Sequence, residues 1–137
     1  MKNILSVIAG LILGFLAVLF SESICQKMYP FAAGIDFSKA DRETLTFIMG
    51  MVPLGAFMTL LAGYAFGSFF GGLVAFLISG NKFSPITVGG IIMVGGIINL
   101  VMIPHPLWFI VISQFMYVPF SLAGGKIGSL IKKRHHK

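Results

Sequence analysis

Long uncharged stretches, separated by short charged ones, dominate the pattern of this chain. The uncharged runs cover residues 3–21, 44–81 and 83–125. A helix that crosses a membrane needs about 20 consecutive apolar residues. The first run is therefore long enough for one crossing, and the third is long enough for two.

Two prolines divide the third run. Pro104 and Pro106 flank His105, and each proline lacks a backbone donor and disfavours helical geometry in the residue before it. The pattern predicts a tight turn at this point, between a helix over 85–103 and a helix over 107–131.

The middle run is ambiguous, because a single helix over 44–81 would be about 57 Å long, against a hydrocarbon core of about 30 Å. Charge decides between one crossing and two. With one crossing, all basic residues except Lys27, Lys39 and Arg42 lie on the side of the termini, as the excess of Lys and Arg in cytoplasmic loops requires. With two crossings, only Lys2 would remain inside. We therefore expect one crossing.

These patterns predict an all-α membrane protein, a four-helix transmembrane bundle with both termini inside (N-in/C-in). Residues 1–137 then form a single integral membrane domain. The surplus length before the second crossing is assigned to an interfacial helix, since Ser38–Asp41 resembles a capping-box start and Pro53 breaks the helix. The expected helices are 3–23, 41–52 (interfacial), 54–79, 85–103 and 107–131.

Composition supports a place in the membrane. Hydrophobic residues make up 57% of the chain and charged residues 10%, whereas soluble domains have roughly 25% charged residues. The net charge of +6 does not indicate nucleic acid, because half of the basic residues lie between Lys126 and Lys137. A basic segment beside a membrane helix normally meets anionic lipid and fixes orientation. We expect a multi-pass protein of the cell (inner) membrane.

The N-terminal segment has a competing interpretation as a cleaved signal peptide. Its apolar stretch, Ile4–Phe20, is longer than the usual 7–15-residue core of such peptides, so we expect a retained first helix. Cys25 is the only cysteine, which excludes an intrachain disulfide and a redox pair of cysteines within one chain.

Glycines recur at helical spacing in three of the expected crossings. Lipid is as apolar as leucine, so membrane helices associate through close backbone approach and polar contacts. We expect these glycines to pack helices within the chain, and a homodimer through the glycine face of the first or second helix is the alternative. The packing glycines are Gly10, Gly14, Gly63, Gly67, Gly71, Gly124 and Gly128.

Polar residues inside a membrane are costly and are functional candidates for that reason. Asn99 and Gln114 lie about 8 and 12 Å below the expected turn by helical rise, so their amides are expected to bond each other. Tyr117 continues the same stripe, and Tyr64 and Ser68 of the second crossing are further partners. The stripe is either structural or the lining of a small pocket that opens outward.

Glu22 and His105 form a second candidate pair. Glu22 is expected to end the first helix, and His105 lies in the turn between the third and fourth crossings, so both are placed near the outer surface. A carboxylate beside an imidazole would raise the histidine pKa and create a proton- or metal-responsive pair. The alternative is that both side chains are simply solvated.

One segment resembles a known group of proteins. Gly95–Phe109 reads Gly-Gly-Ile-Ile-Asn-Leu-Val-Met-Ile-Pro-His-Pro-Leu-Trp-Phe, which is similar to the third-to-fourth helix hairpin of small bacterial four-helix membrane proteins with no assigned function. Val52–Phe57 is similar to the segment that opens their second helix, and the resemblance covers roughly residues 45–125. It implies the same topology and draws attention to Asn99, His105 and Trp108, but it implies no substrate.

No catalytic motif is present, and neither a catalytic residue, a metal site nor a cofactor is expected. We expect a non-catalytic binding or accessory module for lipid, a small apolar ligand or a membrane complex. The alternative is a small oligomeric transporter or channel, with Asn99, Gln114 and Tyr117 as its polar site and Glu22 and His105 at its outer mouth. Breaks at prolines 53 and 119 are the only hints of the discontinuous helices that transporters use. An enzyme acting on lipid or quinone is the least favoured class.

Overall fold

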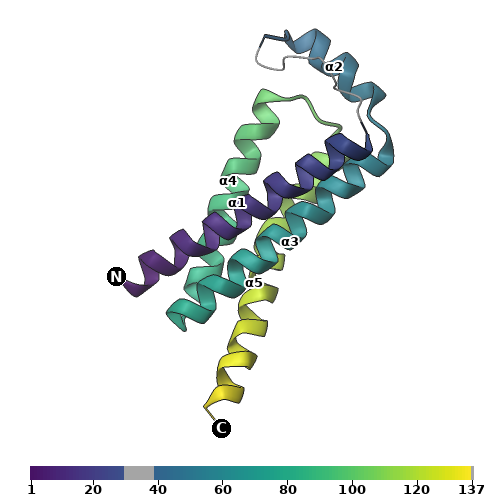
Figure 1. Ribbon diagram of the computed structural model, residues 1–137. Helices are drawn as coiled ribbons and strands as arrows, with labels where there is room; N and C mark the ends of the chain where they lie inside the picture. Colours follow the sequence, from purple (N-terminus) through teal and green to yellow (C-terminus); the bar gives the residue numbers. More distant parts are fainter. Residues whose placement is uncertain (30–38, 137) are drawn as a thin grey trace.

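The computed structural model describes residues 1–29 and 39–136, and this part of the chain is helical apart from short connections. Four of its helices are long and apolar enough to cross a membrane, namely α1, α3, α4 and α5, which confirms the predicted all-α architecture with four helices of spanning length. Figure 1 shows the arrangement. The helices are α1 (Lys2–Met28), α2 (Arg42–Met51), α3 (Leu54–Ser79), α4 (Phe83–Met102) and α5 (Leu107–His135).

The middle uncharged run contains one spanning helix. α2 has 10 residues and is about 15 Å long, too short to cross, whereas α3 has 26 residues. Asp41 caps α2 by accepting a hydrogen bond of 2.9 Å from the Thr44 backbone N–H, and this bond lowers the pKa of Asp41. The expected cap began at Ser38, which lies outside the described residues. Pro53 then separates α2 from α3.

Three helix ends differ from the expected ones by two residues or more. α1 continues to Met28 rather than residue 23, and α5 continues to His135 rather than residue 131, because Glu, Lys and Arg are good helix formers and do not end a helix by their charge. α4 begins at Phe83, before Pro85, since proline is tolerated in the first turn. Pro119 lies inside α5 without ending it, as the expected helix over 107–131 requires, and the break that would have hinted at a transporter is absent there.

α3 is the central helix of the bundle and packs against α1, α4 and α5. Its apolar residues surround the whole helix, as expected of a helix with protein on most sides. Both chain termini and the α3–α4 connection lie at one end of the bundle, and α2 and the α4–α5 connection lie at the other (Figure 1). We call the latter the α2 end.

Glycines bring α1 and α3 into backbone contact. A methyl group built on Gly71 would lie 2.8 Å from the carbonyl oxygen of Gly10, and one built on Gly67 would lie 2.8 Å from that of Gly14. These two glycine faces therefore cover each other within the chain, and a homodimer would have to use another surface. The other packing glycines also face neighbouring helices: Gly63 meets Ser21, Gly124 meets Phe69, and Gly128 meets Leu73 and Phe76.

Buried serines join the helices at two points. The Ser6 hydroxyl donates to the Ser84 hydroxyl at 3.1 Å and ties α1 to α4. The Ser121 hydroxyl donates to the Pro85 carbonyl oxygen at 2.6 Å and ties α5 to α4. Both pairs lie in the half of the bundle away from the α2 end, so that half is held together by polar contacts as well as by close packing.

Candidate functional site

A cavity lies between α1 and α4 in the half of the bundle nearest the α2 end. The two helices run in the same direction, are joined near their N-termini by Ser6 and Ser84, and separate toward their C-termini (Figure 1). The space between them has a volume of about 340 Å³. It is lined by Phe15, Val18, Leu19, Glu22, Tyr64, Ile92, Gly95, Gly96, Asn99 and Tyr117.

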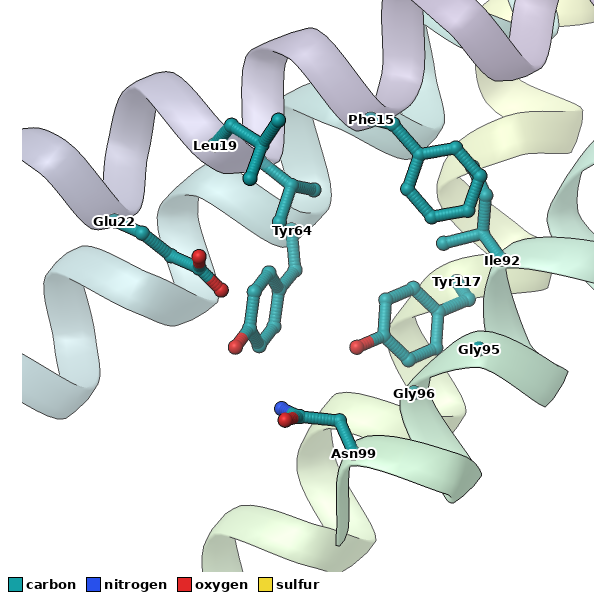
Figure 2. A pocket seen from close by; sticks show the side chains of 10 residues that line it. Phe15, Leu19, Glu22, Tyr64, Ile92, Gly95, Gly96, Asn99 and Tyr117 are labelled. Atoms are coloured by element: carbon teal, nitrogen blue, oxygen red, sulfur yellow. The ribbon is translucent and has the colours of Figure 1, made fainter. Parts of the chain in front are cut away.

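Each of the four spanning helices contributes one polar side chain to this cavity. Figure 2 shows the Glu22 carboxylate of α1, the Tyr64 hydroxyl of α3, the Asn99 amide of α4 and the Tyr117 hydroxyl of α5 directed toward a common space. We call these four residues the polar cluster. The opposite end of the cavity, next to Phe15, is apolar, so the site as a whole is amphipathic.

No side-chain hydrogen bond or ion pair joins any member of the polar cluster to another described residue. Tyr64 and Tyr117 are nevertheless 5% and 4% exposed, and Glu22 and Asn99 are half-buried. None of their polar atoms is among the fully buried, unpaired atoms of the described residues, so the four polar groups open onto the cavity. Within the described part of the chain they have no side-chain hydrogen-bond partner.

Aromatic packing fixes the two tyrosines. The Tyr64 ring centroid lies 6.1 Å from that of Phe109 and 5.9 Å from that of Tyr117, while Phe109 packs on Phe57 at 5.1 Å. Gly96 makes room for Tyr117, since a methyl group there would lie 2.8 Å from the tyrosine ring. These contacts between α3, α4 and α5 hold both rings against the cavity in one orientation.

The candidate pair of Glu22 and His105 does not form. His105 lies in the α4–α5 turn, where its Nδ1 is 2.8 Å from the Ile103 carbonyl oxygen and its ring stacks on Phe109 at 5.0 Å. Burial lowers the pKa of His105, and the bond to Ile103 opposes this shift. Glu22 does not end α1, because the helix continues for six more residues, about 9 Å, and this places Glu22 inside the bundle beside the cavity.

The expected bond between Asn99 and Gln114 is also not formed. Asn99 lines the cavity, whereas both amide atoms of Gln114 are buried without a hydrogen-bond partner in the described part of the chain. The Ser68 hydroxyl is likewise buried without a hydrogen-bond partner among the described residues. Matching depth along two helices does not fix how each helix is rotated about its axis, and that rotation separates the two amides.

The apolar wall of the cavity was not among the candidates from sequence. On α1, Phe15 lies three and four residues before Val18 and Leu19, and Glu22 lies four and three residues after them, so the four side chains share one helix face. The sequence contained a clue to this wall, because the Glu22 carboxylate lies on the same helix face as three apolar side chains. The clue did not stand out, since apolar residues occupy every face of the helices in this chain.

The comparisons with protein families, curated proteins and solved structures find no match for this chain. The resemblance of residues 95–109 to small bacterial four-helix membrane proteins therefore stays an expectation. Among the residues that the structure describes, no group of three or more His, Cys, Asp or Glu side chains is placed to hold a metal ion. The polar cluster is accordingly the candidate functional site of the described chain.

Proposed function

We propose that this protein binds a small, mainly apolar molecule that enters the cavity between α1 and α4 from the bilayer. The observation that carries this proposal is an amphipathic cavity of about 340 Å³ with one unbonded polar side chain from each spanning helix. Ligand pockets of roughly 300–1,000 Å³ with apolar walls and a few convergent polar groups are the usual form of small-molecule sites. The cavity lies at the lower end of that range.

The lining favours binding over catalysis. Its titratable side chains are one carboxylate, Glu22, and two phenols, Tyr64 and Tyr117. General acid–base chemistry usually needs a second group with a pKa near the working pH, and nucleophilic catalysis needs a nucleophile beside a base. Neither arrangement is found around this cavity. We accordingly place the protein among non-catalytic binding or accessory modules.

Transport is the less favoured function. The cavity is confined to the half of the bundle at the α2 end, and α5 continues through Pro119. Discontinuous helices are the usual mark of a transport site near the bilayer midplane, and each of the four spans is a continuous helix in the part of the chain described. A binding module that is open toward one leaflet agrees better with this geometry.

The membrane setting is part of the proposal. We place the chain in the cell (inner) membrane with both termini and the α3–α4 connection in the cytoplasm, since this arrangement puts most Lys and Arg residues inside. α2 then lies along the outer interface. Its first residue, Arg42, donates from Nη1 to the Val101 carbonyl oxygen at 3.4 Å, which satisfies an unpaired carbonyl in the last turn of α4 and favours α2 staying close to the bundle.

Anionic lipid is the partner we propose at the cytoplasmic end. A second cavity of about 470 Å³ lies between the α3–α4 connection and α5, and it combines the lysines Lys82 and Lys126 with the apolar residues Phe76 and Leu122. A phosphate headgroup beside the two ammonium groups and an acyl chain along the apolar wall suit this composition.

The binding proposal is tested by filling the cavity. A methyl group built on Gly95 meets only the Phe15 ring, at 3.8 Å, so a larger side chain there enters the cavity without striking the backbone. Gly90 lies on the same helix, and a methyl group there meets nothing within 4 Å. Gly95→Leu is therefore the test variant, and Gly90→Leu is the matched control.

Native mass spectrometry of the purified protein in lipid nanodiscs is the measurement. We expect a small molecule, distinct from the nanodisc lipids, to remain bound to the wild-type chain and to Gly90→Leu, and to be lost from Gly95→Leu. Equal retention in both variants would contradict the assignment of this cavity. The absence of any bound small molecule from protein prepared from its native membrane would contradict the proposed function.

A further inference from the structure

The polar end of the cavity carries a single formal charge. Glu22 is the only acidic residue in the four spanning helices, because the other three acids occupy positions 36, 41 and 43. Its carboxylate is directed into the cavity (Figure 2). An acidic group at membrane depth is costly unless it is paired, yet Glu22 forms no ion pair or hydrogen bond with any described residue.

The rest of the lining adds acceptors and aromatic rings but no positive charge. Asn99 supplies an amide oxygen, Tyr64 and Tyr117 supply hydroxyls, and the cavity lining contains no Lys, Arg or His. Faces of aromatic rings attract cations, and the attraction is strongest where water is excluded. An anionic head would meet the Glu22 carboxylate with no cation to offset it, whereas a cationic head would meet an opposite charge and two rings.

We infer that the ligand of this cavity is an amphiphile with a cationic amine or quaternary ammonium head. This inference rests on the proposed function and specifies its ligand class. The head lies against the Glu22 carboxylate with the Asn99 amide oxygen and the tyrosine rings around it, and the apolar body extends toward Phe15. A bare metal ion fits less well, since a single carboxylate would hold it and the apolar half of the cavity would stay unused.

The cavity also limits the length of the ligand. Phe15 and Glu22 mark its apolar and acidic ends on α1, and seven residues of helix separate them by about 10 Å. A phenyl ring joined to an ammonium group by a short alkyl chain has this length. A full-length acyl chain would extend beyond the cavity into the bilayer between α1 and α4.

The experiment compares a cationic probe with a neutral probe of the same shape. The probes are (3-phenylpropyl)trimethylammonium and its carbon isostere, 4,4-dimethylpentylbenzene, titrated into the full chain in phosphatidylcholine nanodiscs. Binding to the Gly95→Leu variant is subtracted to remove simple partition into lipid. Glu22→Gln removes the charge at constant size, and Glu43→Gln makes the same change on α2, away from the cavity, as the control.

We expect saturable binding of the cationic probe, at least tenfold tighter than that of the neutral probe. Glu22→Gln should weaken binding of the cationic probe by tenfold or more and leave the affinity for the neutral probe unchanged. Glu43→Gln should change neither affinity. Protection of the buried Cys25 from a thiol reagent shows whether Glu22→Gln is folded. If it is not, the comparison of the two probes on the wild-type chain still decides the question.

Failure of the proposed ligand class and failure of the proposed binding function give different results. Saturable binding of the neutral probe that equals or exceeds binding of the cation, or cation binding that survives Glu22→Gln, overturns the ligand class but leaves a binding cavity. If neither probe binds saturably and the native mass spectrum contains no bound small molecule, the proposed function itself falls, and this inference falls with it.

Discussion

Gly10 of α1 and Gly71 of α3 lie with their backbones in direct contact. A methyl group on Gly10 would be 2.5 Å from the Gly71 carbonyl oxygen, and one on Gly71 would be 2.8 Å from the Gly10 carbonyl oxygen. The neighbouring atoms are backbone, which cannot swing aside as a flexible side chain can. Any side chain at either position therefore has to push the two helices apart.

Gly10→Ala should destabilise the bundle by about 1–3 kcal/mol, the usual cost of inserting a methyl group into a packed interior. The matched control is Gly90→Ala, where a methyl group meets nothing within 4 Å and where alanine favours helix. The thermal midpoint of unfolding in detergent is the measurement. Equal midpoints for Gly10→Ala and the wild-type chain would contradict the close contact.

Gln114→Met should raise the free energy of unfolding. Both amide atoms of Gln114 are buried without a hydrogen-bond partner in the described residues, and an unpaired buried polar group costs roughly 1–3 kcal/mol. Methionine has a similar length and no amide group that needs hydrogen-bond partners, so we expect the free energy of unfolding to rise by about 1 kcal/mol. Gln114→Ala is the comparison, since it removes the amide but leaves a void. A lower midpoint for Gln114→Met would show that the amide has a partner in the folded protein.

The stability of the protein should fall in mildly acidic solution because of His105. Burial lowers the pKa of His105 below its ordinary value of 6.5, so the folded state favours the neutral ring. The stability that this preference adds to the folded protein is fully present above pH 6.5. It is lost as the pH falls below that value and through the pKa of His105 in the folded state. His105→Phe keeps an aromatic ring against Phe109 and removes the titration. Unfolding midpoints measured from pH 8 to pH 5 should fall more steeply for the wild-type chain than for His105→Phe.

Cys25 should resist thiol reagents until the protein unfolds. It is 2% exposed, and its Sγ lies 3.6 Å from the Ala56 carbonyl oxygen. Buried thiols react slowly because the reagent cannot reach them. Labelling by a maleimide in mild detergent should therefore be slow and should become complete in denaturant. Fast labelling of the folded chain would contradict the packing of α1 on α3 at this level.

The proposed orientation is tested with introduced cysteines, which the protection of Cys25 makes practical. Lys39→Cys, at the α2 end, should react with a membrane-impermeant maleimide in intact cells. Asn81→Cys, in the α3–α4 connection, should react only after the membrane is permeabilised. The reverse pattern would place the termini outside and would move α2 to the cytoplasmic face.

The number and type of the helices were predictable from sequence because they depend on length and charge. An uncharged run either is or is not long enough to cross a hydrocarbon core, and Pro104 and Pro106 mark the turn between α4 and α5 directly. The split of residues 44–81 into α2 and α3 also followed from charge placement and from Pro53. Helix ends were less accurate, since Glu22 and the basic residues of α5 are compatible with continued helix.

The site followed only partly from sequence, and the tertiary structure decided the rest. Asn99, Tyr117 and Glu22 were singled out because polar groups stand out in an apolar chain, but the sequence paired them with Gln114 and His105. Which side chains meet depends on the rotation and splay of the helices, set here by contacts such as Gly10 with Gly71 and Ser6 with Ser84. Periodicity along one helix contains no information about its neighbours, so only their packing could bring Glu22 and Tyr64 to a common cavity.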